Sequence, residues 1–320
     1  MNLLKHLFPK KVHKIGLFWL TIAFFRLNLA QVVHDSAELE ALKQGSQVIL
    51  LRHANSEYNF EYGKMSLRNY SIEDERILRV RKDLRDAPLS DLGLQQCKEA
   101  QPMANRLDVG YVFVSPMKRA LETAYNVFLS HPNFDNIKFI VLPMLKEAID
   151  TTCDIPMNIK DTISDYRNKF KKFDTSEVEK YSDQEHYFLR DIDLEFSKKI
   201  STSKIYDPSD PIGSNAYDLL LDEIDRNYPN KIEKDLNILK RVALAKNHIK
   251  EFITTTSPGD DSKIILVGHS YYFKMWTAQW ENPLSSYGND LPPPSKSTFL
   301  QNCQFFSDNA SFPSTTRPTP

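Results

Sequence analysis

Four short runs of apolar residues, spread along the chain with helical patterns between them, constrain its fold most. They are QVILLR (47–52), YVFVS (111–115), KFIVL (138–142) and KIILVG (263–268). Each run is continuous, rich in branched side chains and too short for a helix, which is the pattern of a strand buried on both faces. Strands that alternate with helices predict an α/β fold. We expect a three-layer α/β/α sandwich with a mostly parallel central sheet.

The helices between these runs are indicated by caps and by apolar spacing. Ser36, Ser90 and Ser115-Pro116 are suited to begin helices, and Gly45 to end the first of them. The predicted helices cover 35–45, 90–107, 115–130 and 232–255, and one begins at residue 270. FLQNCQFF near the end predicts a last strand at the sheet edge. Residues 60–88 are charged without clear periodicity, which indicates a long surface excursion.

The same patterns predict one domain, over 35–310. The acidic segment 150–235, broken by DPSDPIG and NYPN, is expected to be a mainly helical insertion packed on that domain. Residues 311–320 are expected to be a disordered tail. The chain shows no internal repeat and no linker that would divide the core.

The first 34 residues form a separate extension. Lysines precede an apolar run, Ile15–Phe25, that Arg26 closes. The run is too short to span a bilayer, which needs roughly 20 apolar residues. It fits a signal peptide, or an anchor within residues 1–30 that would direct the chain to the secretory pathway or a membrane. It also fits an amphipathic extension of a cytoplasmic protein, which is the location we expect; membrane association depends on which interpretation holds.

Composition excludes several function classes. The net charge of −1 does not suit a nucleic-acid-binding domain, which is usually strongly basic. Glycine is scarce, at nine residues, and no glycine-rich nucleotide-binding motif is present. The three cysteines are far apart, so they suggest neither a disulfide framework nor a zinc site. None is followed six positions later by arginine, as a cysteine-dependent phosphatase requires.

Polar residues stand where each predicted strand ends. Arg52 and His53 end the first strand, Arg119 follows the second, Glu147 the third and His269 the fourth. Ligands of open α/β sheets bind beyond the carboxyl ends of the strands. Each residue alone is most often a structural or surface group, but their joint occurrence at strand ends indicates one site.

This set of side chains fits phosphoryl transfer through histidine. An imidazole attacks phosphorus only when neutral, and an adjacent Arg52 favours the neutral form of His53. Arginine binds phosphate oxygens through two parallel hydrogen bonds. The helices that follow Ser115 and His269 are expected to direct backbone amides at the same anion. Such transfer requires no metal and no other cofactor.

Five blocks of sequence, in order, resemble the histidine phosphatase superfamily, also called phosphoglycerate mutase-like. They are LRHANSEYN, LSDLGLQQC, SPMKRALET, LKE and VGHS, and they lie between residues 47 and 272. The resemblance implies a phosphomonoester hydrolase with a phosphohistidine intermediate and no cofactor. Its catalytic residues would be His53 as nucleophile, Glu147 as proton donor and His269, and its phosphate would be held by Arg52, Asn59, Arg119 and His269.

The chain departs from the family pattern directly after His53. The family usually has glycine there, and this chain has Ala54. Glycine would allow close backbone approach or a positive φ. Since alanine is the smallest replacement, we expect a slightly altered pocket rather than an inactive one.

Three alternative functions share features with this sequence. A serine esterase with Ser270 as nucleophile fails, because Tyr272 replaces the glycine of the elbow and no histidine follows His269. A phosphoglycerate mutase-type phosphotransferase stays open, although the excursion over 60–88 does not resemble the short mutase segment. A non-catalytic phospho-ligand-binding protein is the remaining alternative. The expected partner is a phosphorylated small molecule or phosphoprotein substrate, with no nucleic acid; the oligomeric state is not indicated.

Overall fold

A central sheet of six strands organises the protein, for which we use a computed structural model. The structure describes residues 36–157, 171–180, 214–259, 261–282 and 291–312. The strand order is β4-β3-β2-β5-β1-β6. All neighbouring strands are parallel except β6, which pairs antiparallel with β1 at the edge, so the mostly parallel sheet and the edge strand are confirmed. The strands are β1 (Val48–Arg52), β2 (Val109–Val114), β3 (Lys138–Val141), β4 (Phe173–Asp174), β5 (Lys263–Gly268) and β6 (Phe305–Ser307).

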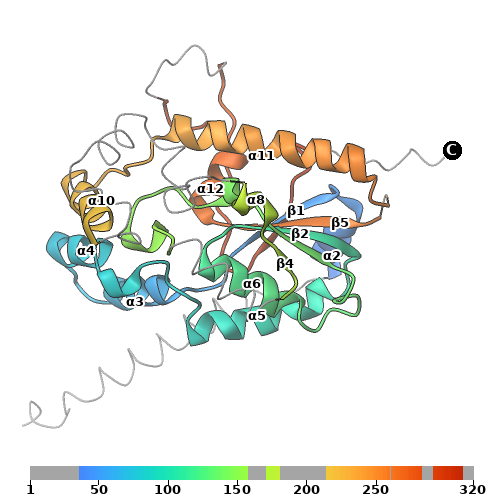
Figure 1. The fold of residues 1–320 in the computed structure, drawn as a ribbon, viewed down its shortest axis with the longest axis horizontal. Helices are drawn as coiled ribbons and strands as arrows, with labels where there is room; N and C mark the ends of the chain where they lie inside the picture. Colours follow the sequence, from blue (N-terminus) through green and yellow to red (C-terminus); the bar gives the residue numbers. More distant parts are fainter. Residues whose placement is uncertain (1–35, 158–170, 181–213, 260, 283–290, 313–320) are drawn as a thin grey trace, which may run out of the picture.

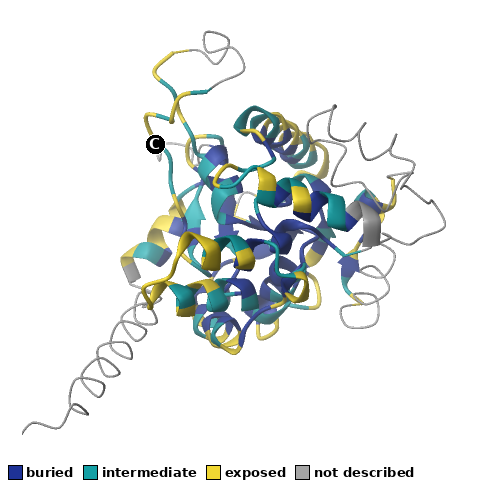
Figure 2. Ribbon diagram, turned by 90° about the vertical axis from the view of Figure 1, so that its left-hand side faces the viewer, coloured by how far each residue is buried: buried dark blue, intermediate teal, exposed yellow. Residues whose placement is uncertain are grey.

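Helices cover both faces of this sheet, which confirms the three layers (Figure 1). On one face lie α5 (Asp91–Ala104) and α6 (Lys118–Phe128), and α2 (Ser36–Gln44) adds Leu39 and Leu42 to the same cluster. The other face packs against α11 (Asp235–Thr256) and α12 (Ser270–Trp276). Figure 2 shows the buried strands enclosed between partly exposed helices. The apolar runs are therefore continuous for the reason that the sequence indicated: helices cover these strands on both faces.

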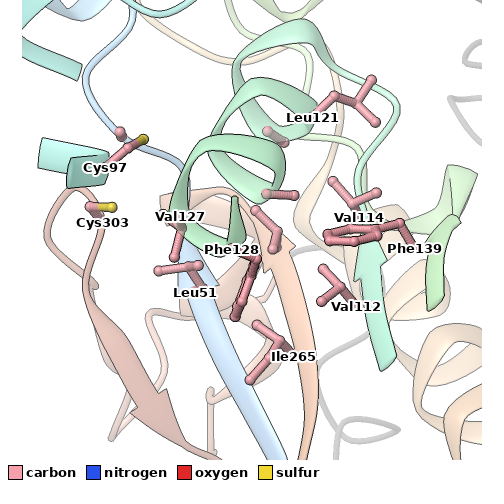
Figure 3. Packing of buried hydrophobic residues seen from close by; sticks show 14 of the residues in the cluster. Leu51, Cys97, Val112, Val114, Leu121, Val127, Phe128, Phe139, Ile265 and Cys303 are labelled. Carbon is pink, nitrogen blue, oxygen red and sulfur yellow. The ribbon is translucent and has the colours of Figure 1, made fainter. Parts of the chain in front are cut away.

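The first cluster shows how α6 is seated on the sheet. Phe128 and Val127 project from α6 beside Leu51 of β1 and Ile265 of β5 (Figure 3). All four side chains are fully buried. Since burying one such side chain contributes about 1.5–3 kcal/mol, this packing fixes the position of α6 relative to the ends of β1 and β5.

Residues 60–88, which were predicted to be a long surface excursion, are largely helical. The stretch contains the larger part of α3 (Glu57–Ser66), all of α4 (Ile72–Arg79) and the short helix η1 (Lys82–Leu84). Ser56 and Ser71 each form a capping box, with Asn59 and Asp74. Both helices are short and bury few residues, Tyr58 in α3 and Leu78 and Arg79 in α4, so periodicity signals them weakly and their caps are the clearer sign.

The insertion is described in part. Within 150–235 the structure places η3 (Thr152–Asp154), α8 (Ser176–Glu179) and α10 (Ser214–Arg226), preceded by η2 (Pro143–Leu145). It also places β4, a strand that the sequence did not predict. An ion pair of 2.7 Å between Arg76 and Asp225 joins α4 to α10, and both helices lie beyond the carboxyl ends of the strands (Figure 1).

Three predictions fall wholly or partly outside the described residues. These are the extension 1–34, the parts of the insertion at 158–170 and 181–213, and the tail from residue 313. The tail was predicted to begin too early, because Phe312 is buried and stacks on Trp276. Among the described residues, no helix has the length and apolar character needed to cross a membrane.

Candidate active site

His53 lies directly beyond β1 and is almost fully buried. Its backbone N–H donates to the carbonyl of Gly268, at the end of β5, over 2.9 Å. Its ring Nδ1 lies 2.6 Å from the carbonyl oxygen of Ala54. A carbonyl only accepts, so Nδ1 carries the proton and Nε2 carries the lone pair. Nε2 in turn accepts from Nε of Arg119 over 3.3 Å, which places the lone pair beside a fixed cation.

The neutral state of His53 follows from its surroundings. Burial lowers its pKa well below the ordinary value of 6.5, and the charges of Arg119 and Arg52 lower it further. The expected repulsion by Arg52 is therefore present, but burial is the larger cause. At neutral pH the imidazole is therefore unprotonated at Nε2, whose lone pair accepts from Arg119.

The loop after His53 is held by the block LSDLGLQQC, which forms the start of α5. The backbone N–H of Asn55 donates to Oε1 of Gln96 over 2.8 Å, and its carbonyl accepts from the N–H of Ser90 over 3.0 Å. A Cβ on Gly93 would lie 2.0 Å from the carbonyl oxygen of Asn55. Glycine is thus required for α5 to approach this loop, which explains the block physically.

Arg52 and Asn59 line the same cavity as His53. Nη1 of Arg52 donates to the carbonyl of Leu300 over 2.9 Å, while its buried Nε has no hydrogen-bond partner among the described residues. Burial lowers the pKa of Arg52 to about 10, so it stays charged at neutral pH. Oδ1 of Asn59 accepts from the hydroxyl of Ser56 over 3.0 Å, which leaves its Nδ2 as the donor for a ligand.

Arg119 projects from the first turn of α6 and is 2% exposed. Its Nη2 donates to Oδ1 of Asp154 over 2.9 Å, and its Nη1 donates to the carbonyl of Cys153. Oδ2 of Asp154 accepts from the N–H of Thr151 over 3.0 Å, so the carboxylate is itself fixed. Asp154 was missed from the sequence. The capping-box pattern that Thr151 and Asp154 form was the signal that could have indicated it.

His269 lies beside His53 but is not among the residues that line the cavity described below. It is fully buried, and its ring centroid is 5.1 Å from that of His53. Its Nε2 lies 2.7 Å from the hydroxyl of Ser115, and its Nδ1 has no partner among the described residues. The prediction that Ser115 caps α6 was wrong: the helix begins at Lys118, after Met117, because the Ser115 hydroxyl is engaged by His269.

Glu147 comes from the irregular segment after η2 and is buried. Its Oε1 accepts from the backbone N–H of Ala148 (2.8 Å) and of Tyr272 (2.9 Å), and its Oε2 from that of Tyr271 (3.2 Å). Two amides of α12 that were expected to face an anion are thus bound to Glu147 instead. Burial raises the pKa of Glu147 to about 7, and the charge of Asp154 contributes to the rise. At neutral pH this carboxyl can both give and take a proton.

The cavity that these groups share has a volume of about 240 Å³. Five of the six predicted site residues line it: Arg52, His53, Asn59, Arg119 and Glu147. Tyr58, Lys231 and Tyr271, which no pattern singled out as a set, are among the other residues of the described wall, as is Asp154. The described residues contain no group of three or more His, Cys, Asp or Glu side chains that could hold a metal ion. Chemically, the site offers a neutral imidazole, two guanidinium groups and a carboxyl of raised pKa.

Comparison with protein families decides the assignment. The family model "Histidine phosphatase superfamily (branch 1)" matches residues 48–186. Over this segment, which is less than half of the chain, the protein is similar to the histidine phosphatase superfamily. The matched segment contains Arg52, His53, Asn59, Arg119 and Glu147, while His269 follows it. The members of this superfamily are phosphatases or mutases, which supports an enzyme.

Solved structures of the superfamily are similar to this chain at low identity. Phosphoglycerate mutase from Bacillus anthracis is 15% identical, with 86% of this chain and 96% of that one covered and a TM-score of 0.40. A mycobacterial glucosyl-3-phosphoglycerate phosphatase in complex with VO3 is 14% identical, with 81% and 88% covered and a TM-score of 0.38. Phosphoserine phosphatase from Entamoeba histolytica is 16% identical, with 71% and 76% covered and a TM-score of 0.32. No curated protein sequence matches the chain.

Proposed function

We propose that this protein hydrolyses phosphomonoesters through a phosphohistidine intermediate on His53. The observation that carries the proposal is the state of that ring: Nδ1 is held by the Ala54 carbonyl, and Nε2 presents its lone pair beside Arg119. Nε2 attacks phosphorus, the bond from phosphorus to the ester oxygen breaks, and the phosphoryl group becomes attached to His53. The ester oxygen leaves with the electron pair of that bond.

Stabilisation of the phosphate in this step comes from Arg52, Arg119 and Asn59, which line the cavity, while His269 lies beside the His53 ring, 5.1 Å between ring centroids. A phosphoryl group in transfer carries its charge on three equatorial oxygens, so catalysis consists mainly of positioning and electrostatic stabilisation. The buried Nε–H of Arg52, which lines the cavity, has no partner among the described residues, and it is a donor that a bound phosphate would satisfy. This support is independent of sequence resemblance.

Glu147 completes both steps as acid and then base. In its protonated form it donates to the leaving alkoxide, and as a carboxylate it then takes a proton from the water that attacks the phosphohistidine. The second step releases inorganic phosphate, restores the neutral His53 and returns the proton to Glu147. A pKa of about 7 suits a group that must act in both directions at neutral pH.

Hydrolysis is favoured over mutase-type transfer by the rest of the cavity wall. A mutase that rebinds an acidic sugar acid needs surplus positive charge. Two charged residues of the wall are paired with residues outside it: Nζ of Lys231 lies 3.2 Å from Asp235, and Asp150 forms an ion pair of 2.7 Å with Arg79. Within each pair the positive and negative charges cancel, so this wall has no surplus positive charge. It therefore favours a substrate whose one acidic group is the phosphate. We propose a phosphorylated small molecule or a phosphoprotein as that substrate.

The test is hydrolysis of p-nitrophenyl phosphate by the wild type, by His53→Ala and by His248→Ala. His248 lies on α11 away from the cavity, so its variant controls for the loss of a histidine. We expect activity in the wild type and in the control and none in His53→Ala. Activity that survives in His53→Ala would overturn the proposal. Transfer of phosphate between 2- and 3-phosphoglycerate would favour the mutase.

A further inference from the structure

A buried cluster of charges joins the segment that carries Glu147 to the start of α11. Lys146, Glu233 and Arg241 are each at most 1% exposed. The carboxylate of Glu233 accepts from Nε (2.8 Å) and Nη2 (3.0 Å) of Arg241, and its Oε2 lies 3.5 Å from Nζ of Lys146. None of these three side chains lines the cavity or has a part in the proposed chemistry.

The cluster is bonded to the backbone on both sides of Glu147. Nη1 of Arg241 donates to the carbonyls of Met144 and Lys146, at 2.9 Å each, and its Nη2 lies 3.5 Å from the carbonyl of Glu147. On the other side, the N–H of Ile149 donates to Glu233 over 3.2 Å. The backbone from residue 144 to residue 149 is thereby fixed to the amino end of α11.

Such fixing is needed because Glu147 is not itself part of a helix or strand. Residues 146–150 lie between η2 and η3 without regular structure, yet the Glu147 carboxyl must meet the amides of Tyr271 and Tyr272 and reach a leaving group. An error of about 1 Å in such a placement can lower a rate roughly 100-fold.

Stability alone is a weak reason for this cluster. Taking three charges out of water has a high cost in desolvation, and apolar replacement of a buried ion cluster is often neutral or stabilising. What apolar side chains cannot supply is the planar fork of an arginine directed at several carbonyls at once. The number of bonds to the segment around Glu147 therefore points to a role in geometry.

We propose that Arg241 and Glu233 are positioning residues that hold Glu147 at the leaving group. The inference rests on the proposed function, since it assigns Glu147 the role of proton donor. Its consequence is selective. An alkyl phosphate needs a proton on its leaving alkoxide, whereas p-nitrophenolate is a weak base that leaves without one. Disturbing the cluster should therefore affect alkyl substrates and spare the aryl substrate.

The experiment compares kcat/KM for β-glycerophosphate and p-nitrophenyl phosphate in Arg241→Lys and Glu233→Gln. This parameter reports only the steps up to release of the leaving group. It is therefore insensitive to the later hydrolysis of the phosphohistidine, in which Glu147 acts as a base. We expect a loss of roughly 10- to 100-fold for the alkyl substrate and little change for the aryl one. Val242→Ala is the matched control: a buried neighbour on α11 whose side chain cannot hydrogen-bond the segment. Val242→Ala should change kcat/KM for the two substrates by the same factor.

Equal losses for the two substrates in both cluster variants would overturn the inference and leave the proposed function intact. Activity in His53→Ala would instead overturn the proposed function. If either single variant does not fold, the triple variant Lys146→Met/Glu233→Met/Arg241→Met removes all the charges together and keeps apolar volume. The same selective loss for the alkyl substrate is expected there, and its absence in the folded triple variant would equally overturn the inference.

Discussion

Asp154 and Arg119 form a buried ion pair inside the candidate phosphate pocket, with 2.9 Å between Oδ1 and Nη2. The pair fixes the plane of the guanidinium, so that its Nε is directed at Nε2 of His53. It also places a negative charge where a phosphate is expected to bind. That charge is, after burial, the second cause of the raised pKa of Glu147. Asp154 thus connects the orientation of one group to the proton affinity of another.

Replacing Asp154 by asparagine should therefore move the alkaline limb of the pH profile. Asp154→Asn removes the charge and keeps a similar shape, so the pKa of Glu147 falls and activity on β-glycerophosphate declines from a lower pH. Inorganic phosphate should inhibit the variant roughly tenfold more strongly, because a nearby like charge is gone. Asp150→Asn, at another carboxylate of the same wall, should leave the limb in place. An unmoved limb in Asp154→Asn would contradict this coupling.

The wild-type pH profile follows from the raised pKa of Glu147 and the lowered pKa of His53. As an acid, Glu147 must be protonated, and its pKa is about 7. The kcat/KM for an alkyl phosphate should therefore fall about tenfold per pH unit above pH 7. His53 stays neutral on the acid side, because burial and the two arginines hold its pKa well below 6.5. A titration of kcat/KM from pH 5 to pH 9 measures this, and Glu147→Gln should have no alkaline limb. An optimum above pH 8 would exclude Glu147 as the acid.

Stability should depend on pH through the same carboxyl. Because the folded-state pKa of Glu147 is raised from 4.5 to about 7, the folded protein binds this proton more tightly than the unfolded chain. The resulting stability is fully present below pH 4.5 and is lost as the pH rises through 7. Between pH 4.5 and pH 8.5 the wild type should lose about 3 kcal/mol more unfolding free energy than Glu147→Gln. Urea unfolding at both pH values measures the difference, and parallel losses would show that the carboxyl is not buried in this way.

The sheet and most of the site could be predicted because their signals are local. Each buried strand is a continuous apolar run, and parallel strands bring their carboxyl ends to one edge. Arg52, His53, Arg119 and Glu147 could therefore be grouped from the sequence alone. The superfamily resemblance added Asn59, whose capping contact with Ser56 has no chemical signature of its own.

What could not be predicted depends on contacts between distant parts of the chain. The α12 amides that bind Glu147 are 124 and 125 residues away from it in sequence, so an open anion site at α12 was wrongly expected. Ser115 has the sequence signature of a helix cap, but its hydroxyl contacts His269 instead. Glu233 and Arg241 belong to no motif. They bond mainly to each other and to backbone groups, which are the same in every sequence, so no sequence pattern marks their partners.

Ala54, the departure from the family glycine, should support activity rather than weaken it. Its φ is not among the positive values of the described non-glycine residues, so its backbone conformation does not need glycine. Its carbonyl holds Nδ1 of His53, its N–H donates to Thr123 over 3.0 Å, and its methyl group is fully buried. Ala54→Gly should therefore keep kcat/KM for p-nitrophenyl phosphate within about twofold. It should lower the unfolding free energy by about 1–2 kcal/mol, through the freer unfolded chain and the lost methyl burial.

Ala54→Val gives the opposite test of the same position. A larger side chain in this closed packing should destabilise the protein by about 1–3 kcal/mol. It should also displace the carbonyl that fixes the His53 tautomer, so activity should fall along with stability. Urea unfolding and steady-state rates on both variants separate the two effects. A tenfold or greater rise in kcat/KM for Ala54→Gly would mean that alanine weakens the site, because the only change that could produce it is release of the loop beside His53.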